Sequence, residues 1–251
     1  MALDFMIHCG GAEVERQALV DVEVPERTRT YCPVPHDNFA NLIEDQLGQV
    51  GFQFGEQAHA LNKQGQQYFG MAELLSPSQP DQDWGLVAGW RSSYDKSMIA
   101  AFVVGSQVFV CDNLAFSGEV QIGRKHTTHI MRDLPYMVEA AVMGTKGMAD
   151  QQVIRYERYK DARLKDSVVN HTIIQMLRTG IISSSRVAKV VNEYYEPTHS
   201  EHLNENGHRT NWTLFNAATE SLKGTGLNNL PSRTIALHGL MDQATDYALA
   251  A

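Results

Sequence analysis

Residues 84–116 constrain the fold of this 251-residue chain more than any other part of it. Within them, residues 98–104 are apolar on both of the faces that an extended chain presents, which is typical of an interior strand covered by helices on at least one side. Turn residues lie on either side of this run, near Tyr94-Asp95-Lys96 and at Gly105-Ser106, where Gly suits the first central position of a type II′ hairpin. Residues 84–116 are therefore predicted to form three consecutive strands at the centre of a sheet.

Further strands are expected on the N-terminal side of this block. Residues 52–61 and 67–75 predict the two strands of a hairpin, because Asn62 and Gly65 between them tolerate the positive φ that tight turns require. Earlier in the chain, Val20, Val22 and Val24 alternate with acidic residues, which is the pattern of a half-buried strand and predicts one edge strand.

Helical spacing occurs before and after the strands. Residues 37–50 have apolar side chains at helical intervals, with Asp37 or Asn38 available to cap the first turn. After about residue 130 the apolar spacing is again helical, and Asp133 with Pro135 predicts the start of the next helix. A helix ending before Gly180 and two more helices, at about 186–194 and 212–222, are predicted after it.

The order of elements predicts an α+β fold, because strands and helices are segregated instead of alternating. We expect one antiparallel β-sheet of about five strands, preceded by one helix and followed by several helices. Residues 1–30 are expected to be an N-terminal extension or edge strand. Residues 31–251 are expected to form a single α+β domain, β-rich over 52–116 and helical over 127–251.

The cysteine content and the charge of the chain limit its cellular environment and its binding partners. The three cysteines have no CxxC spacing, so neither a disulfide framework nor a zinc site is indicated, and we expect a reducing cytoplasm without membrane attachment. The net charge is −8, and residues 1–90 alone carry −9. This acidity argues against a broad nucleic-acid surface and leaves the middle third as the place for an anion site.

Common mechanistic motifs are missing from the sequence. There is no P-loop, GxGxxG, HExxH, GxSxG or EF-hand loop. We therefore expect no cofactor, and enzymatic activity is the weaker of the functional readings.

The first group of candidate site residues surrounds the turn after the first strand of the central block. Arg91, Tyr94, Asp95 and Lys96 place charged and polar groups on a rigid scaffold, where ligands often bind. The alternative is that these residues only form the turn and keep it soluble.

The second group follows the predicted third strand. Asp112 and Asn113, after Cys111, could bind a ligand, and Arg124, Lys125 and His126 at a helix start favour a phosphate. No metal is expected, although His126, His129 and Asp112 are of types that bind divalent ions. The alternative is that Cys111 is a core residue and Asp112-Asn113 a turn.

The third group is a basic stretch in the helical part, with Arg155 and Arg158 as candidate phosphate contacts and Tyr156 and Tyr159 beside them. Acidic residues are interspersed, so a solvated helix face with internal ion pairs is the competing interpretation. Trp84 and Trp90 have the same parity and are expected to lie buried on one sheet face.

Several segments resemble a family of phage- and plasmid-encoded proteins known as domain of unknown function 932. The likeness rests on residues 89–97, with Asp95-Lys96-Ser97, on residues 105–119, with Cys111-Asp112-Asn113, and on residues 124–127, with Lys125-His126-Thr127. Residues 181–185 and 211–223 are also similar, so it extends over roughly 30–240. The resemblance implies a mobile-element origin and no established activity. The order of elements is also similar to that of Rad52-like single-strand annealing proteins, which is a likeness of fold alone.

Three functions are consistent with the sequence. The leading hypothesis is a non-enzymatic DNA-binding protein of a phage or plasmid, acting in recombination, replication or repair, as a homo-oligomer on single-stranded DNA. Its expected phosphate contacts are Arg91, Lys96, Arg124, Lys125, His126, Arg155 and Arg158. The second is a metal-dependent enzyme acting on nucleic acid or a nucleotide. The third is an interaction protein that binds a host defence or replication factor through its acidic first third.

Overall fold

The computed structural model describes residues 11–75, 84–108, 113–225 and 229–250. The chain forms two compact units. The sheet unit comprises Met1–Gly105 and Gly118–Met148, and the helical unit comprises Ser106–Ser117 and Ala149–Ala251.

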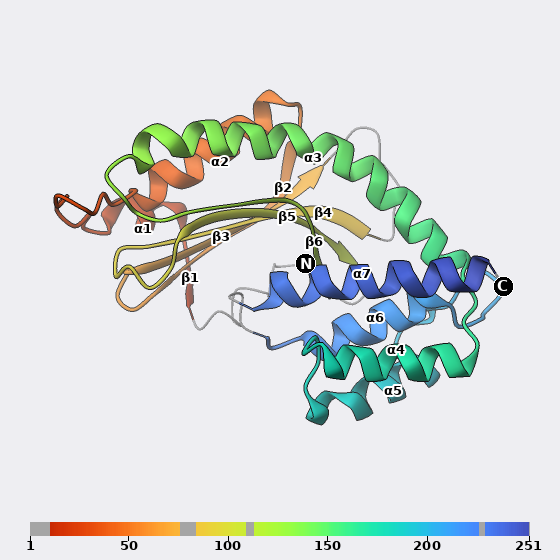
Figure 1. The fold of residues 1–251 in the computed structure, drawn as a ribbon. Helices are drawn as coiled ribbons and strands as arrows, with labels where there is room; N and C mark the ends of the chain where they lie inside the picture. Colours follow the sequence, from red (N-terminus) through yellow and green to blue (C-terminus); the bar gives the residue numbers. More distant parts are fainter. Residues whose placement is uncertain (1–10, 76–83, 109–112, 226–228, 251) are drawn as a thin grey trace. The chain divides into compact units, whose positions relative to one another are not determined.

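The β-strands form a single six-stranded sheet in the order of the chain (Figure 1). The first four strands pair with their sequence neighbours in antiparallel fashion. The strands are β1 (Ala12–Val14), β2 (Gln53–Asn62), β3 (Gln67–Leu75), β4 (Trp84–Ser93), β5 (Ala100–Val108) and β6 (Asn113–Arg124). The mixed α and β composition and the antiparallel sheet agree with the prediction, but there are six strands instead of about five.

The predicted hairpin is confirmed as β2 and β3. Lys63, Gln64 and Gly65 in its turn have φ angles of 49°, 58° and 86°. The Asn62 side chain accepts a hydrogen bond of 2.7 Å from the Lys63 amide, which stabilises the turn locally. The hairpin register follows, with Asn62 opposite Gln67 and Ala58 opposite Met71.

The predicted turn at Gly105-Ser106 is wrong, because both residues lie inside β5. Ser106 is buried, and its hydroxyl is hydrogen-bonded to the hydroxyl of Tyr156. A glycine followed by a serine is typical of a turn in sequence. Here the serine lies within a strand instead, and its hydroxyl is hydrogen-bonded to a tyrosine that is distant in the chain. The connection between β5 and β6 falls on residues 109–112, outside the described residues.

The predicted edge strand at Val20–Val24 is also wrong. Val20 belongs to the short helix α1 (Arg16–Asp21), in which Leu19 is buried and Val20 is exposed. The edge strand is β1, whose Val14 pairs with His59 of β2. Among the residues that the structure describes, two helices therefore precede β2, namely α1 and α2 (His36–Gln49), where one was expected.

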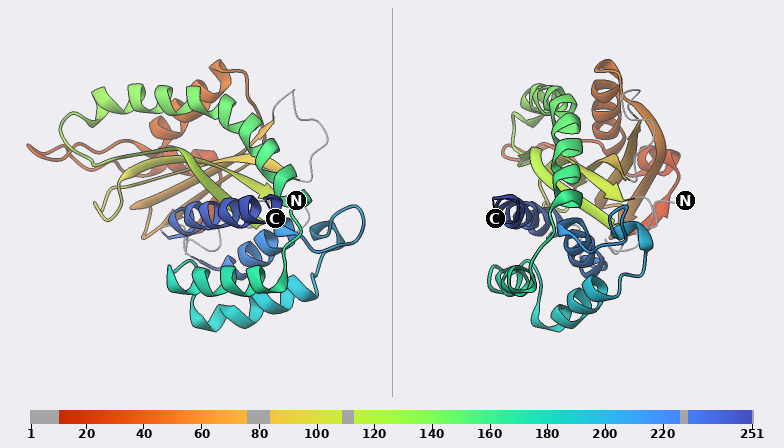
Figure 2. Two further views of the ribbon diagram at one scale, coloured as in Figure 1. Left: turned by 45° about the vertical axis from the view of Figure 1, so that its right-hand side comes forward. Right: turned by 90° about the vertical axis from the view of Figure 1, so that its right-hand side faces the viewer.

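The predicted amphipathic helix near the front is confirmed as α2, which buries Phe39, Ile43 and Leu47. The next helix, α3 (Ile130–Asp161), begins five residues before Pro135 and continues without a break. In the sheet unit, α2 and the first half of α3 lie against the same face of the sheet (Figures 1 and 2). Trp84 and Trp90 are 2% and 3% exposed, so the expectation that they are buried is confirmed.

The helical unit holds the rest of the helices, which contact one another as a group (Figure 2). They are α4 (Asp166–Arg178), α5 (Val187–Tyr195), α6 (Asn211–Leu222) and α7 (Leu230–Leu249), with short 3-10 helices at Ser184–Arg186 and Ser200–His202. The prediction missed α7, because Thr234, His238 and Thr245 are buried among its apolar residues and interrupt the helical pattern. Gly180 follows α4 with a φ of 75°, as the predicted helix end requires.

No helix among the described residues is long and apolar enough to span a membrane.

Candidate functional site

Three segments of the sheet unit that are far apart in sequence meet at one recess. The β4–β5 turn contributes Lys96 and Ser97, the residues after β6 contribute Lys125 and His126, and Thr30 with Tyr31 completes the wall. This sheet-end recess has a volume of about 390 Å³. It is open to solvent on the side of the exposed lysines.

Asp95 organises the turn that carries Lys96. Its carboxylate accepts hydrogen bonds of 3.0 Å from the Ser97 amide, 3.1 Å from Gln67 Nε2 and 3.1 Å from Lys63 Nζ. Burial alone would raise the pKa of Asp95, but the hydrogen bonds from Ser97 and Lys63 hold that pKa well below its usual value. Lys96 itself has a φ of 62°, a left-handed conformation that the Asp95 contacts stabilise.

Lys96 and Lys125 are the two cations of the recess. The Lys96 ammonium lies 4.5 Å from the centre of the Tyr31 ring, and the Tyr31 hydroxyl donates a 3.0 Å hydrogen bond to the Tyr94 carbonyl. Neither lysine has an ion pair or a side-chain hydrogen bond among the described residues. The recess therefore presents two uncompensated ammonium groups, which favours an anionic ligand.

His126 lies in the wall of the recess and is 8% exposed. Its Nε2 atom is 3.3 Å from the Ser92 hydroxyl, while Nδ1 makes no hydrogen bond of normal geometry. Burial lowers the pKa of His126, and the backbone of Cys32 opposes that shift only in part. A neutral imidazole is therefore favoured, and it can donate or accept one hydrogen bond but adds no charge.

Tyr94 is 3% exposed and has a structural position beneath the turn. Its hydroxyl accepts a 3.1 Å hydrogen bond from the His36 amide at the start of α2, and the two rings stack 3.9 Å apart. Tyr94 and Asp95 therefore shape the turn that carries Lys96, and neither lines the recess.

Arg91 and Arg124, also expected as phosphate contacts, are engaged elsewhere in the sheet unit. Arg91 is half-buried on β4 opposite Phe69 and interacts with another group of the chain. Burial lowers the pKa of its guanidinium. Arg124 forms an ion pair with Asp133 in the first turn of α3. Neither lines the recess.

Arg155 and Arg158 belong to the internal scaffold of the helical unit. The Arg155 Nε atom is 3.3 Å from an Asp242 oxygen, and the Arg158 Nη2 atom is 2.6 Å from an Asp246 oxygen. Tyr156 and Tyr159 beside them are 0% and 1% exposed, so neither ring is available for stacking on a base. The paired charges agree with the alternative interpretation of this stretch, in which its charges form ion pairs, although the partners lie on α7.

The remaining candidates do not converge on a metal centre in the part of the chain that the structure describes. Cys111 and Asp112 lie outside the described residues, Asn113 is the first residue of β6, and His129 is exposed just before α3. The described residues contain no group of three or more His, Cys, Asp or Glu side chains placed to hold a metal ion.

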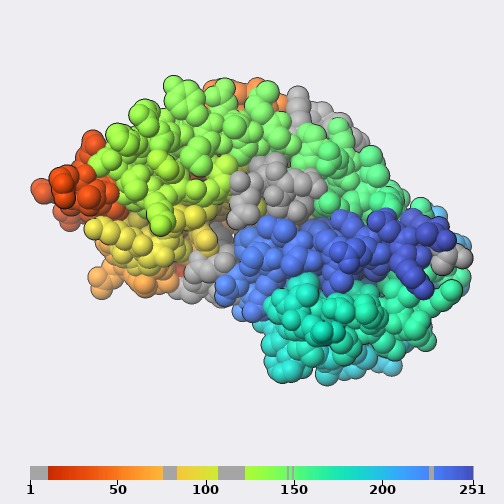
Figure 3. Space-filling model, in the orientation of Figure 1, coloured from red at the N-terminus to blue at the C-terminus, as the bar shows by residue number. Residues whose placement is uncertain are grey.

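A larger groove of about 710 Å³ lies in the helical unit between α4 and α7, which lie side by side (Figure 3). Its lining includes His171, Gln175 and Tyr247 but no Asp, Glu, Lys or Arg. It therefore lacks the charge that an anion requires.

Sequence reasoning missed Thr30, Tyr31 and Ser97 as parts of the recess. The two hydroxyl residues have no distinctive spacing, and Tyr31 lies in an irregular segment before Pro33. Tertiary contacts bring this segment to the recess, among them the hydrogen bond of 3.2 Å from the Cys32 amide to the His126 carbonyl and that of 3.0 Å from the Tyr31 hydroxyl to the Tyr94 carbonyl.

No known protein family, curated protein or solved structure matches this chain. The resemblance to domain of unknown function 932 therefore stays a prediction from the sequence. Two of the segments on which it rests, Asp95-Lys96-Ser97 and Lys125-His126-Thr127, both contribute residues to the sheet-end recess.

Proposed function

We propose that this chain is a non-enzymatic protein that binds single-stranded DNA and holds a backbone phosphate in the sheet-end recess. Its cellular role in this proposal is recombination, replication or repair of a phage or plasmid genome. The resemblance of the sequence to a phage and plasmid family supports that setting.

One observation carries the proposal: Lys96 and Lys125 reach the same recess without a carboxylate partner among the described residues. An ammonium is a compact cation that binds phosphate oxygens, and each phosphate contact on DNA releases counterions. The hydroxyl of Thr30 at the same recess adds a hydrogen-bond donor, whereas the Ser97 hydroxyl already donates to Asp95.

The geometry favours a contact with phosphate over one with a base. The Tyr31 ring is 5% exposed and Lys96 covers it, so a base cannot stack on it in this arrangement. The net charge of −8 also favours a few local contacts over a broad basic surface.

The first test measures binding of an oligothymidine strand, longer than about 16 nucleotides, by fluorescence anisotropy across a salt series. Changing Lys96→Gln or Lys125→Gln should each weaken binding about tenfold, because a hydrogen bond to a charged group contributes roughly 1.5 kcal/mol. Each change should also reduce the slope of log K against log salt by about 0.7, the value for one phosphate contact on a single strand.

Arg178→Gln is the matched control, because it removes one positive charge from an exposed position at the end of α4. It should leave affinity and slope close to those of the unchanged protein. Equal losses of affinity for the strand in the control and in the two lysine variants, or no binding of the strand at low salt, would refute the proposal. Degradation of the strand in the presence of a divalent metal would instead favour the enzymatic alternative.

A further inference from the structure

A second recess lies entirely within the helical unit. It has a volume of about 320 Å³ and is lined by residues of the α3–α4 linker, the end of α5 and the loop before α6. Its charged and aromatic lining residues are Arg163, Asp166, Tyr194, His208 and Arg209. We call it the arginine recess.

Arg209 is held by aromatic rings instead of a carboxylate. Its guanidinium carbon lies 4.5 Å from the ring centre of Tyr195 and 5.2 Å from that of Tyr194. The two rings meet edge to face, with centres 5.1 Å apart, and Tyr194 is 2% exposed. The two rings hold the guanidinium without a carboxylate, so its N–H groups are available for an anion.

Neither arginine of the recess has an ion pair or hydrogen bond among the described residues. This distinguishes Arg163 and Arg209 from Arg155 and Arg158, which pair with carboxylates of α7. Arg209 is half-buried, and a half-buried cation that lacks an internal anion favours binding of an external one.

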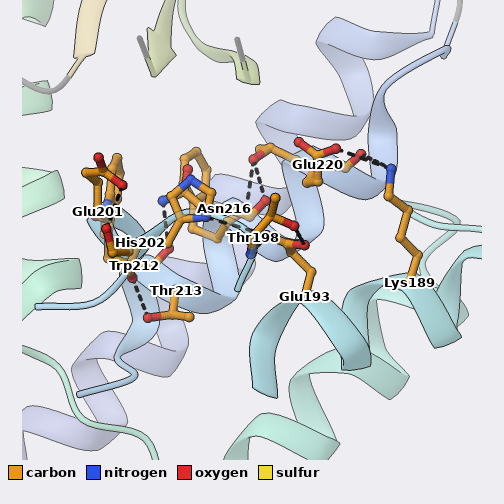
Figure 4. A network of polar contacts seen from close by, with 12 residues as sticks. Lys189, Glu193, Thr198, Glu201, His202, Trp212, Thr213, Asn216 and Glu220 are labelled. Atoms are coloured by element: carbon orange, nitrogen blue, oxygen red, sulfur yellow. Dashed lines mark hydrogen bonds and ion pairs between the residues drawn. The ribbon is translucent and has the colours of Figure 1, made fainter. Parts of the chain in front are cut away.

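The loop that carries Arg209 is anchored by hydrogen bonds at several points (Figure 4). Glu193 accepts hydrogen bonds of 2.9 Å and 2.7 Å from the amide and hydroxyl of Thr198, and Thr213 donates one of 2.6 Å to the His202 carbonyl. The Asn204 side chain accepts a 2.9 Å hydrogen bond from the His208 amide. The recess is therefore pre-organised, which lowers the entropy cost of binding.

The opposite wall is the start of α4. Lys165 precedes the helix and provides no side-chain cap, and its carbonyl accepts hydrogen bonds of 2.8 Å and 3.1 Å from the Val168 and Val169 amides. Asp166 also lines the recess, and its carboxylate accepts a 3.4 Å hydrogen bond from Tyr195. Two guanidinium groups and one carboxylate give the recess a formal charge of +1 with histidine counted as neutral.

From these contacts we infer that the arginine recess is a second phosphate-binding site that takes one phosphodiester of a nucleic-acid strand. A phosphodiester carries a single negative charge and matches the charge of the recess, whereas a phosphate monoester or free phosphate carries more and is opposed by Asp166. The inference deepens the proposed function and rests on it for the source of the phosphodiester.

The test uses the full chain and two kinds of probe. The dinucleotide d(TpT), with one phosphodiester, is titrated while ¹H–¹⁵N NMR spectra are recorded, beside matched titrations with thymidine and with inorganic phosphate. We expect d(TpT) to shift a set of amide resonances that thymidine and phosphate do not shift. This set should be lost in Arg209→Gln and in Arg163→Gln, and kept in Arg178→Gln.

With the oligothymidine strand, Arg209→Gln and Arg209→Lys should each weaken binding about tenfold, because lysine keeps the charge but not the planar, stacked fork of donors. The exposed Arg163→Gln tests the same site without disturbing the aromatic stack.

The two proposals fail in different ways. If the strand binds and depends on Lys96 and Lys125 but not on Arg163 or Arg209, the inference is overturned and the proposed function stands. If the strand does not bind but d(TpT) shifts resonances that depend on Arg209, the inference stands and the proposed function fails. Shifts by phosphate equal to those by d(TpT) would overturn the assignment of a phosphodiester.

Discussion

At the scale of single residues, Gly70 shows how the sheet accommodates its largest side chain. It lies in register with His59 on β2 and with Trp90 on β4. A Cβ atom built on Gly70 would lie 2.1 Å from Trp90 Nε1, the atom that donates a 2.8 Å hydrogen bond to Tyr68. The missing side chain is therefore what lets the indole lie across β3.

Gly70→Ala should lower the free energy of unfolding by about 1–3 kcal/mol, because the methyl group forces the indole or the strand to shift. Gly48→Ala is the control, since a Cβ there meets no atom within 4 Å and the residue lies in helix α2. This control should stabilise the protein by roughly 0.5–1 kcal/mol. Urea denaturation of both variants measures the difference, and an unchanged midpoint for Gly70→Ala would contradict this packing of Trp90.

At the scale of elements, α2 begins without a local cap. Pro35 precedes the helix and has no side-chain acceptor for the free N–H groups of the first turn. The hydroxyl of Tyr94, which lies 58 residues after His36, accepts a hydrogen bond from the His36 amide. The β4–β5 turn therefore serves as the cap of α2 and links the helix to the recess that Lys96 lines.

Tyr94→Phe should cost about 1 kcal/mol of unfolding free energy, because it leaves the buried His36 amide without its acceptor while preserving the ring stack. Tyr136→Phe makes the same chemical change at a residue that is 71% exposed and should have no measurable effect. Chemical denaturation of the two variants compares them directly. Equal stabilities would mean that the cap contributes nothing.

At the scale of the whole molecule, buried histidines make stability depend on pH, and the pKa shift is largest for three of them. Burial lowers the pKa of His36 and of His59 to about 4 and the pKa of His238 to about 3, from an ordinary value of 6.5. Below pH 6.5 the unfolded chain therefore binds protons that the folded chain does not. Stability should rise with pH across this window and fall as the pH is lowered from 6.5 towards 4.

Each of these histidines should contribute up to about 3 kcal/mol to that loss. The free energy of unfolding, measured by urea denaturation at a series of pH values, should decline well before the carboxylates titrate. His59→Gln removes one buried titrating group and should therefore reduce the dependence of the free energy of unfolding on pH. His171→Gln, at an exposed position, should leave that dependence unchanged. A flat profile between pH 6.5 and 4 would show that the buried histidines do not resist protonation.

Local pattern was sufficient to predict much of the secondary structure. The β2–β3 hairpin, α2 and α6 follow from hydrophobic period and turn chemistry, which act between near neighbours in the chain. Gly105-Ser106 and α7 were not predictable in this way. Their polar residues are satisfied by distant partners, as Ser106 is by Tyr156, so the local pattern alone is misleading.

The sequence by itself determined most of the elements and the residue types that could bind an anion, because both depend on composition and spacing along the chain. Only the tertiary structure decided which cations remain available. Arg158 is neutralised by Asp246, 88 residues away, whereas Lys96, Lys125 and Arg209 meet no carboxylate among the described residues. The physical reason is that charge compensation acts over a few ångströms in space, and sequence separation carries no information about that distance.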